Sequence, residues 1–109
     1  MSQYKDIANY LVSAEEERRE VPKVTVSLKP DLTVEEAYLV QQEIVNRKLN
    51  EGRRIVGPKM GLTSFAKMKQ MGIVEPIYGY VFDYMLIENG GKVRLSDLIH
   101  PKVEAEVAF

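Results

Sequence analysis

The stretch Thr33–Gly52, TVEEAYLVQQEIVNRKLNEG, contains the clearest helix of the chain and decides its fold class. Thr33 and Glu36 form a capping box, in which a hydroxyl and a carboxylate each accept a free backbone N–H at the start of the helix. Gly52 is placed to end the helix. One face carries a stripe at helical spacing, made of Val34, Ala37, Tyr38, Gln41, Ile44, Val45, Lys48 and Leu49.

On the N-terminal side of this stretch, residues 4–20 are predicted to form an amphipathic helix with a charged end, EEERRE. Val21 and Pro22 break that helix. Residues 24–28 alternate and are expected to form a short strand or an extended linker.

On the C-terminal side, Thr63 or Ser64 can cap a short helix that Gly72 ends. Residues 77–82 have the composition of a strand. Helices followed by short strands predict an α+β fold with a curved mixed sheet.

The region after the 77–82 strand is expected to contain a hairpin, with strands at 85–87 and 93–95 around the turn residues ENGGK. Ser96 is expected to cap a single turn. His100 precedes Pro101, which favours an extended backbone at the histidine.

The segment HPKVEAEVAF, residues 100–109, alternates as a strand with one buried face. Glu104 and Glu106 then share the other face. Two adjacent carboxylates repel each other unless a cation lies between them, and Mg²⁺ is a common solution because it prefers oxygen ligands. The alternative is an edge strand whose two glutamates face solvent.

Lys59 lies in IVGPKMGLTS, residues 55–64, between two glycines and beside a proline. Such a backbone is suited to close approach to another group. The lysine is therefore either a surface residue with a buried stem or a cation directed at an anionic ligand. The segment has neither of the glycine spacings typical of phosphate-binding loops.

The composition is that of one soluble globular domain: 109 residues, 45% hydrophobic and 28% charged, with a formal net charge of -1. This charge gives no indication of nucleic-acid binding, and no apolar run is long enough to span a membrane. The chain has no cysteine and one histidine, which excludes thiolate chemistry and leaves oxygen ligands for a metal. Because the final alternation stops at Phe109, we expect the chain to be the N-terminal part of a longer polypeptide.

Three strings together resemble a known family: residues 55–64, Pro76-Ile77-Tyr78-Gly79, and residues 100–106. They resemble the 2-keto-4-pentenoate hydratase and 4-oxalocrotonate decarboxylase family of the fumarylacetoacetate hydrolase superfamily. The resemblance runs from about Thr33 to the end and is closer to the decarboxylase branch. It implies a helical region at 1–52, followed at 53–109 by the first strands of a mixed β-barrel that this chain does not complete.

The resemblance also implies a function. It is the metal-dependent decarboxylation of 4-oxalocrotonate, a 2-oxo dicarboxylate, in aromatic meta-cleavage catabolism. Glu104 and Glu106 match two of three acidic ligands for Mg²⁺ or Mn²⁺, Lys59 matches the family lysine, and Asp83 matches an acidic position suited to proton transfer.

Two alternatives stay open: 2-hydroxypenta-2,4-dienoate hydratase, and a non-catalytic fragment or assembly partner of the same fold. The resemblance further implies a cytoplasmic homo-oligomer with a hydratase partner subunit, and a chain that is inactive by itself.

Overall fold

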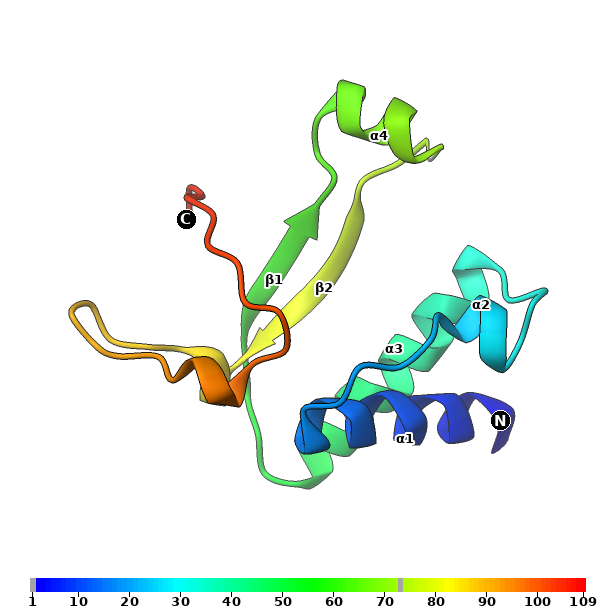
Figure 1. Cartoon of the computed structure of the whole chain (residues 1–109), viewed down its shortest axis with the longest axis horizontal. Helices are drawn as coiled ribbons and strands as arrows, with labels where there is room; N and C mark the ends of the chain where they lie inside the picture. The colour runs from blue at the N-terminus through cyan, green and yellow to red at the C-terminus, as the bar shows by residue number, and fades with distance from the viewer. Residues whose placement is uncertain (1, 73) are drawn as a thin grey trace.

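The computed structural model describes residues 2–72 and 74–109, and it has an α+β arrangement (Figure 1). The order is α1 (Ser2–Glu17), α2 (Val24–Ser27), α3 (Val34–Asn50), β1 (Ile55–Gly61), α4 (Phe65–Met71) and β2 (Ile77–Phe82). Two short 3-10 helices follow, η1 (Asp83–Met85) and η2 (Leu95–Asp97). Within these described ranges, no helix is long and apolar enough to cross a bilayer.

Helices α1 and α3 pack side by side and run in the same direction. Tyr4 near the start of α1 donates a hydrogen bond to Glu36 at the start of α3, with an O–O distance of 2.8 Å. Near the ends of the two helices, Lys48 pairs with Glu15. The core between them is centred on Ile7, Ala8 and Val40, with Tyr4, Leu11, Val24, Leu32 and Ile44 around it.

The predicted boundaries of α3 are confirmed. Thr33 accepts a hydrogen bond from the backbone N–H of Glu36, and the Glu36 side chain accepts one from the backbone N–H of Thr33, which is the expected capping box. Gly52 follows the last turn with φ of 89°, a left-handed conformation that favours glycine. The predicted stripe is partly wrong: Val34 is 69% exposed, whereas Val40, which was not part of it, is buried.

Strands β1 and β2 pair antiparallel and form an open sheet, with Lys59 opposite Gly79 and Ile55 opposite Phe82. Helix α4 connects them; Ser64 caps it and Gly72 ends it with φ of 70°, as predicted. The sheet contacts the helices through β2, because the ring of Tyr78 stacks on that of Tyr38 in α3 at a centroid distance of 4.5 Å.

The prediction for residues 24–28 was wrong, because they contain the helical turn α2. The backbone N–H of Leu28 donates to the carbonyl of Val24 at 2.9 Å, and that of Ser27 donates to Lys23 at 3.0 Å. Val24 packs against the core between α1 and α3. A local turn thus satisfies backbone groups that pair with no strand among the described residues.

The strands predicted after β2 are absent from residues 86–109. The backbone N–H of Gly91 donates to the carbonyl of Glu88 at 2.7 Å, so the expected turn forms without a ladder. The predicted Ser96 cap was also wrong, since Arg94 precedes η2 and no side chain caps it. His100 has φ of 48°, which is not the expected extended backbone.

Residues 101–109 are exposed and have no regular structure, so the predicted half-buried strand was wrong there too. The side chains expected on its buried face lie in solvent, with Val103 98% and Val107 83% exposed. Alternation gives a strand only where a neighbouring edge supplies hydrogen bonds, and within the described residues none does.

Candidate metal and catalytic site

The structure brings together two of the four predicted site residues, Lys59 and Glu106. Lys59 lies on β1, and Glu106 lies on the C-terminal segment that runs beside this strand on the side away from the helices (Figure 1). Lys59 Nζ donates to Glu106 Oε2 at 2.6 Å. Both side chains are about half exposed, at 54% and 53%. The pair thus places an ammonium and a carboxylate together where solvent and small ions can reach both.

Glu104 is two positions before Glu106 on the same exposed segment. In the part of the chain that the structure describes, it forms no ion pair or hydrogen bond. Both carboxylates therefore lie on the same segment, but only that of Glu106 is held by a contact to another described residue. The Glu104 side chain is exposed to solvent.

Asp83 lies apart from Lys59. It directly follows Phe82, which pairs with Ile55, whereas Lys59 pairs with Gly79. The four positions from Gly79 to Asp83 correspond to about 13 Å along a strand. Proton transfer involving both residues therefore requires a substrate that spans this distance, or a different arrangement of the two.

The surroundings of Asp83 are unusual for a carboxylate. Its backbone N–H donates to the carbonyl of Arg54 at 2.9 Å, and its Oδ2 lies 3.9 Å from Arg54 Nε. Its Oδ1 is buried without a hydrogen-bond partner among the described residues. A buried oxygen of this kind is available to accept a proton or a hydrogen bond.

The residues present suit a hard divalent cation. Glu104 and Glu106 supply carboxylate oxygens, the ligand type that Mg²⁺ prefers. In the structure the Lys59 ammonium takes the position of a cation beside Glu106. No group of three or more acidic, histidine or cysteine side chains suited to a metal occurs within residues 2–72 and 74–109. Among the described residues, Glu104 and Glu106 are thus the two carboxylates that could hold such an ion.

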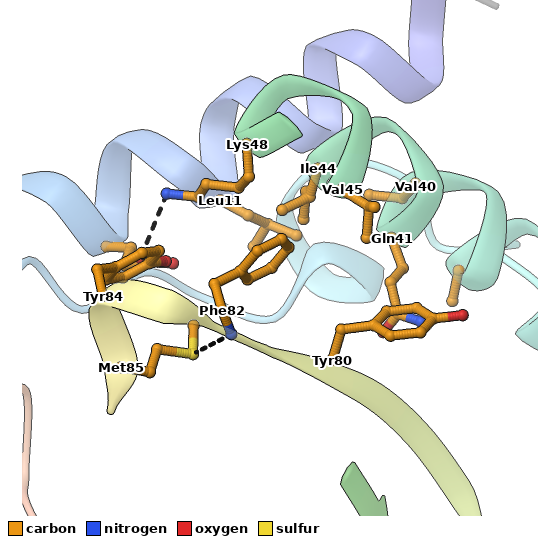
Figure 2. Close-up of a pocket in the computed structure, with 12 residues that line it drawn as sticks. Leu11, Val40, Gln41, Ile44, Val45, Lys48, Tyr80, Phe82, Tyr84 and Met85 are labelled. Atoms are coloured by element: carbon orange, nitrogen blue, oxygen red, sulfur yellow. Dashed lines mark hydrogen bonds and ion pairs between the residues drawn. The ribbon is translucent and has the colours of Figure 1, made fainter. Parts of the chain in front are cut away.

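A second cluster lies on the other side of the sheet and contains residues that the sequence did not single out for a site. It surrounds a hollow of about 330 Å³ between α1, α3 and β2 (Figure 2). The hollow is lined by Leu11, Glu15, Ala37, Val40, Gln41, Ile44, Val45, Lys48, Tyr80, Phe82, Tyr84 and Met85. One feature of the sequence pointed to this cluster. Gln41 and Lys48 interrupt the apolar stripe of α3, and both line the hollow.

Lys48 is the buried cation of this cluster, with a side chain only 6% exposed. Its Nζ lies 3.5 Å from Glu15 Oε1 and 5.1 Å from the centre of the Tyr84 ring. The Tyr84 hydroxyl donates to the same glutamate oxygen at 2.8 Å. Burial lowers the pKa of Lys48, but the Glu15 carboxylate and the Tyr84 hydroxyl outweigh burial, so its pKa is raised. Burial and the bond to Glu15 also raise the pKa of Tyr84.

Comparison with known proteins shows what the chain resembles. No family model matches it. The 4-oxalocrotonate decarboxylase of Pseudomonas sp. strain CF600 is 50% identical over 103 residues, which are 94% of this chain and 39% of that protein. The 2-oxo-hept-4-ene-1,7-dioate hydratase of Escherichia coli is 39% identical over 103 residues, 94% of this chain and 38% of that protein.

Solved structures give the same result. The 4-oxalocrotonate decarboxylase of Pseudomonas putida G7, complexed with calcium and acetate, superposes with a TM-score of 0.87 and 46% identity, covering 91% of this chain and 38% of that one. The same enzyme complexed with magnesium and adipate also has a TM-score of 0.87. The chain spans a little under two fifths of the length of these relatives. In sequence and in fold, the chain is therefore similar to the N-terminal part of the 4-oxalocrotonate decarboxylase and 2-keto-4-pentenoate hydratase family.

Proposed function

We propose that this chain provides the Lys59 and Glu104/Glu106 part of the active site of a divalent-metal-dependent 4-oxalocrotonate decarboxylase. The observation that carries the proposal is the 2.6 Å contact between Lys59 and Glu106, which places the predicted cation beside a predicted metal ligand. The 50% identity to a decarboxylase supports this choice of reaction. The products would be 2-hydroxypenta-2,4-dienoate and CO₂.

The ligands of the relatives support the class of substrate. Adipate, present with magnesium in the Pseudomonas putida G7 enzyme, is hexanedioate. It is the saturated dicarboxylate of the same chain length as 4-oxalocrotonate, which is 2-oxo-3-hexenedioate. A cation and a metal-binding carboxylate pair suit the two ends of such a molecule.

The residues of this chain have distinct roles in the proposed mechanism. Glu104 and Glu106 hold a divalent ion, Mg²⁺ or Mn²⁺, which when bound supplies a Lewis acid for the 2-oxo group. Lys59 exchanges its bond to Glu106 for one to the substrate, where its ammonium offsets the negative charge that develops as CO₂ leaves. Asp83, whose Oδ1 has no partner among the described residues, would move a proton. Since a six-carbon substrate is shorter than the roughly 13 Å along the strand between Lys59 and Asp83, this role requires the complete fold to bring the two residues closer together.

We propose the following fold for the complete site. Residues 1–52 would form a helical region, and residues 53–109 would begin a mixed β-barrel of the fumarylacetoacetate hydrolase type. A third acidic ligand would come from additional polypeptide, so the 109 residues alone would neither bind the metal tightly nor turn over substrate. The protein would act in the cytoplasm in aromatic catabolism, as a homo-oligomer with a hydratase as partner.

Hydration of 2-hydroxypenta-2,4-dienoate is the second candidate reaction, because the Escherichia coli hydratase matches the same 94% of the chain. A non-catalytic assembly partner of the same fold is the third. The test is an assay of the whole polypeptide that carries this sequence, with Mg²⁺ present. Release of CO₂ from 4-oxalocrotonate supports the proposal, whereas water addition to the dienoate without CO₂ release supports the hydratase. Absence of both reactions supports the assembly partner.

A further inference from the structure

The hollow between α1, α3 and β2 contains a cation that the proposed reaction does not use. Figure 2 shows Lys48 and Tyr84 at one end, Gln41 and Tyr80 at the other, and Phe82 between them. The volume of about 330 Å³ is at the lower end of the range of small-molecule sites. An apolar wall with polar groups at its ends is typical of such sites.

The Lys48 ammonium pairs with Glu15 and lies over the Tyr84 ring, and it still has N–H donors for a further acceptor. Among the residues that the structure describes, Glu15 is the one carboxylate bound to it, at a long 3.5 Å. An ammonium has three N–H donors, and a buried cation is stable only when it is paired and well hydrogen-bonded. The long contact to Glu15 therefore leaves Lys48 able to bind a closer anionic acceptor at this end of the hollow.

Glu15 is able to give up its place to such an acceptor. Its side chain is 49% exposed, so that it can turn into water, whereas Lys48 is fixed within the hollow. The Tyr84 hydroxyl, which now donates to Glu15 at 2.8 Å, could then donate to the incoming anion. A carboxylate bound here would receive hydrogen bonds from both Lys48 and Tyr84.

The far end of the hollow favours one charged group in the ligand over two. Gln41 and Tyr80 are neutral, and Lys48 is the one cation among the lining residues. A dicarboxylate would therefore leave its second charge against apolar side chains such as Val40 and Ile44. We propose that this hollow binds a small monocarboxylate with an apolar body, its carboxylate on Lys48 and Tyr84 and its body against Phe82.

This site is distinct from the proposed catalytic one. Glu106, which pairs with Lys59, belongs to the C-terminal segment that runs beside β1 on the side away from α1 and α3 (Figure 1). The hollow is lined instead by residues of α1, α3, β2 and the turn after β2 (Figure 2). A ligand of the hollow would consequently contact neither member of the Lys59–Glu106 pair. Binding at the two sites can be measured separately.

The test is titration of the 109-residue chain with hexanoate, followed by the backbone amide NMR signals of Lys48, Phe82 and Tyr84. Hexanol and adipate serve as comparison ligands. We expect saturable shifts with hexanoate and at least about tenfold weaker binding of hexanol, which cannot form the charged hydrogen bond. Adipate should bind more weakly than hexanoate. Equal binding of hexanol, or tighter binding of adipate, would overturn the proposal.

Three variants distinguish a ligand site from a cluster of side chains that only stabilises the fold. Lys48→Met keeps the aliphatic stem and should weaken hexanoate binding at least about tenfold. Glu15→Gln removes the competing carboxylate and should tighten binding, a gain that a purely structural role would not give. Lys59→Met should leave hexanoate binding unchanged. Loss of binding in Lys59→Met but not in Lys48→Met would assign hexanoate to the other site and refute this one.

A further variant keeps the test valid if Lys48→Met does not fold. Ala37 lines the hollow and is exposed on α3, so Ala37→Trp fills the space without altering the buried core. This variant should lose hexanoate binding while its far-UV circular dichroism stays that of the unsubstituted chain. Unchanged binding in a folded Ala37→Trp variant would show that the ligand lies outside the hollow.

Discussion

Lys59 Nζ and Glu106 Oε2 lie 2.6 Å apart although 47 positions of the chain separate the two residues. The contact joins the C-terminal segment to β1, and it places an ammonium next to a carboxylate proposed to bind a metal. The ammonium and a divalent ion would compete for the same oxygen. Arrival of the metal would therefore release Lys59 for the substrate, which links the two roles proposed for this pair.

Substitution of Lys59 by methionine in the whole polypeptide should separate catalysis from metal binding. The variant loses the positive charge that offsets developing negative charge, so kcat should fall about 10²-fold or more. Its affinity for Mn²⁺ should not fall, because no metal ligand is removed. Steady-state kinetics and Mn²⁺ titration by electron paramagnetic resonance provide the two measurements. Lys67→Met, at an exposed position of α4, is the matched control, and a Lys59→Met enzyme with the control's kcat would contradict the proposed role.

The Glu106→Gln substitution should weaken metal binding. Loss of a carboxylate ligand should raise the Mg²⁺ concentration needed for half-maximal activity at least about tenfold, because charged oxygen ligands dominate the affinity for this ion. Glu88→Gln changes the same residue type in the exposed loop and should leave that concentration unaltered. An equal Mg²⁺ requirement in the two variants would remove Glu106 from the metal site.

The same Glu106→Gln substitution should scarcely affect stability. Both partners of the ion pair are about half exposed, and such pairs contribute at most about 1 kcal/mol. Urea unfolding of the 109-residue chain should therefore give nearly the same free energy for this variant and for Glu88→Gln. A loss of several kcal/mol would mean that the C-terminal segment is held much more firmly than its exposure indicates.

The hydrogen bond from Tyr4 to Glu36 should make stability depend on pH. This bond, together with the backbone N–H of Thr33, lowers the pKa of Glu36 below its ordinary 4.5. The unfolded chain then binds a proton at higher pH than the folded chain, so the contribution is present above about pH 4.5 and is lost as pH falls through the lower native value. Unfolding midpoints in urea, measured from about pH 3 to about pH 6, should show this loss.

Tyr4→Phe provides the test of that assignment. It removes the largest cause of the Glu36 shift, so the pH dependence over this range should be smaller than in the unsubstituted chain. Tyr10→Phe is the control, because Tyr10 forms no side-chain hydrogen bond within the described part of α1. Identical pH profiles for the two variants would show that Tyr4 does not hold the Glu36 carboxylate in its ionised form.

Removal of the α3 cap should cost a measurable part of the stability. Thr33→Ala deletes the hydroxyl that accepts the Glu36 N–H, and it should lower the free energy of unfolding by about 1 kcal/mol. Thr63→Ala deletes the same hydroxyl immediately before the Ser64 cap of α4, where Ser64 itself accepts the backbone bond. The control should change stability by less than about 0.5 kcal/mol. Equal effects would show that the capping box contributes nothing specific.

Elements defined by local chemistry could be predicted from the sequence. Thr33 with Glu36, and Ser64 with Gly72, fix the ends of two helices through bonds within a few residues, and the structure confirms both. Strands were less predictable. Residues 103–107 have the correct alternation, but a strand also needs a neighbouring edge in register, and alternation carries no information about that edge.

The residues of the candidate site could be predicted from the sequence, but their contacts could not. Lys59 and Glu106 could be proposed by residue type and resemblance, but the contact between them depends on the path of the chain through β2 and the segment after it. Lys48 could not be recognised as a charge in a hollow, because Phe82 and Tyr84, which line that hollow with it, are distant in the sequence. Its place within an apolar stripe was compatible with a side chain that simply reaches solvent.

The open sheet has a consequence for how its backbone exchanges hydrogen with solvent. Within the described residues, β1 has a strand neighbour on one side, so only those amides that point toward β2 lie in a ladder. Deuterium uptake along residues 55–61 should therefore alternate between slow and fast sites, with Pro58 contributing no signal. A strand added along the outer edge of β1 would abolish the alternation, so exchange rates would reveal directly whether another polypeptide segment occupies that edge.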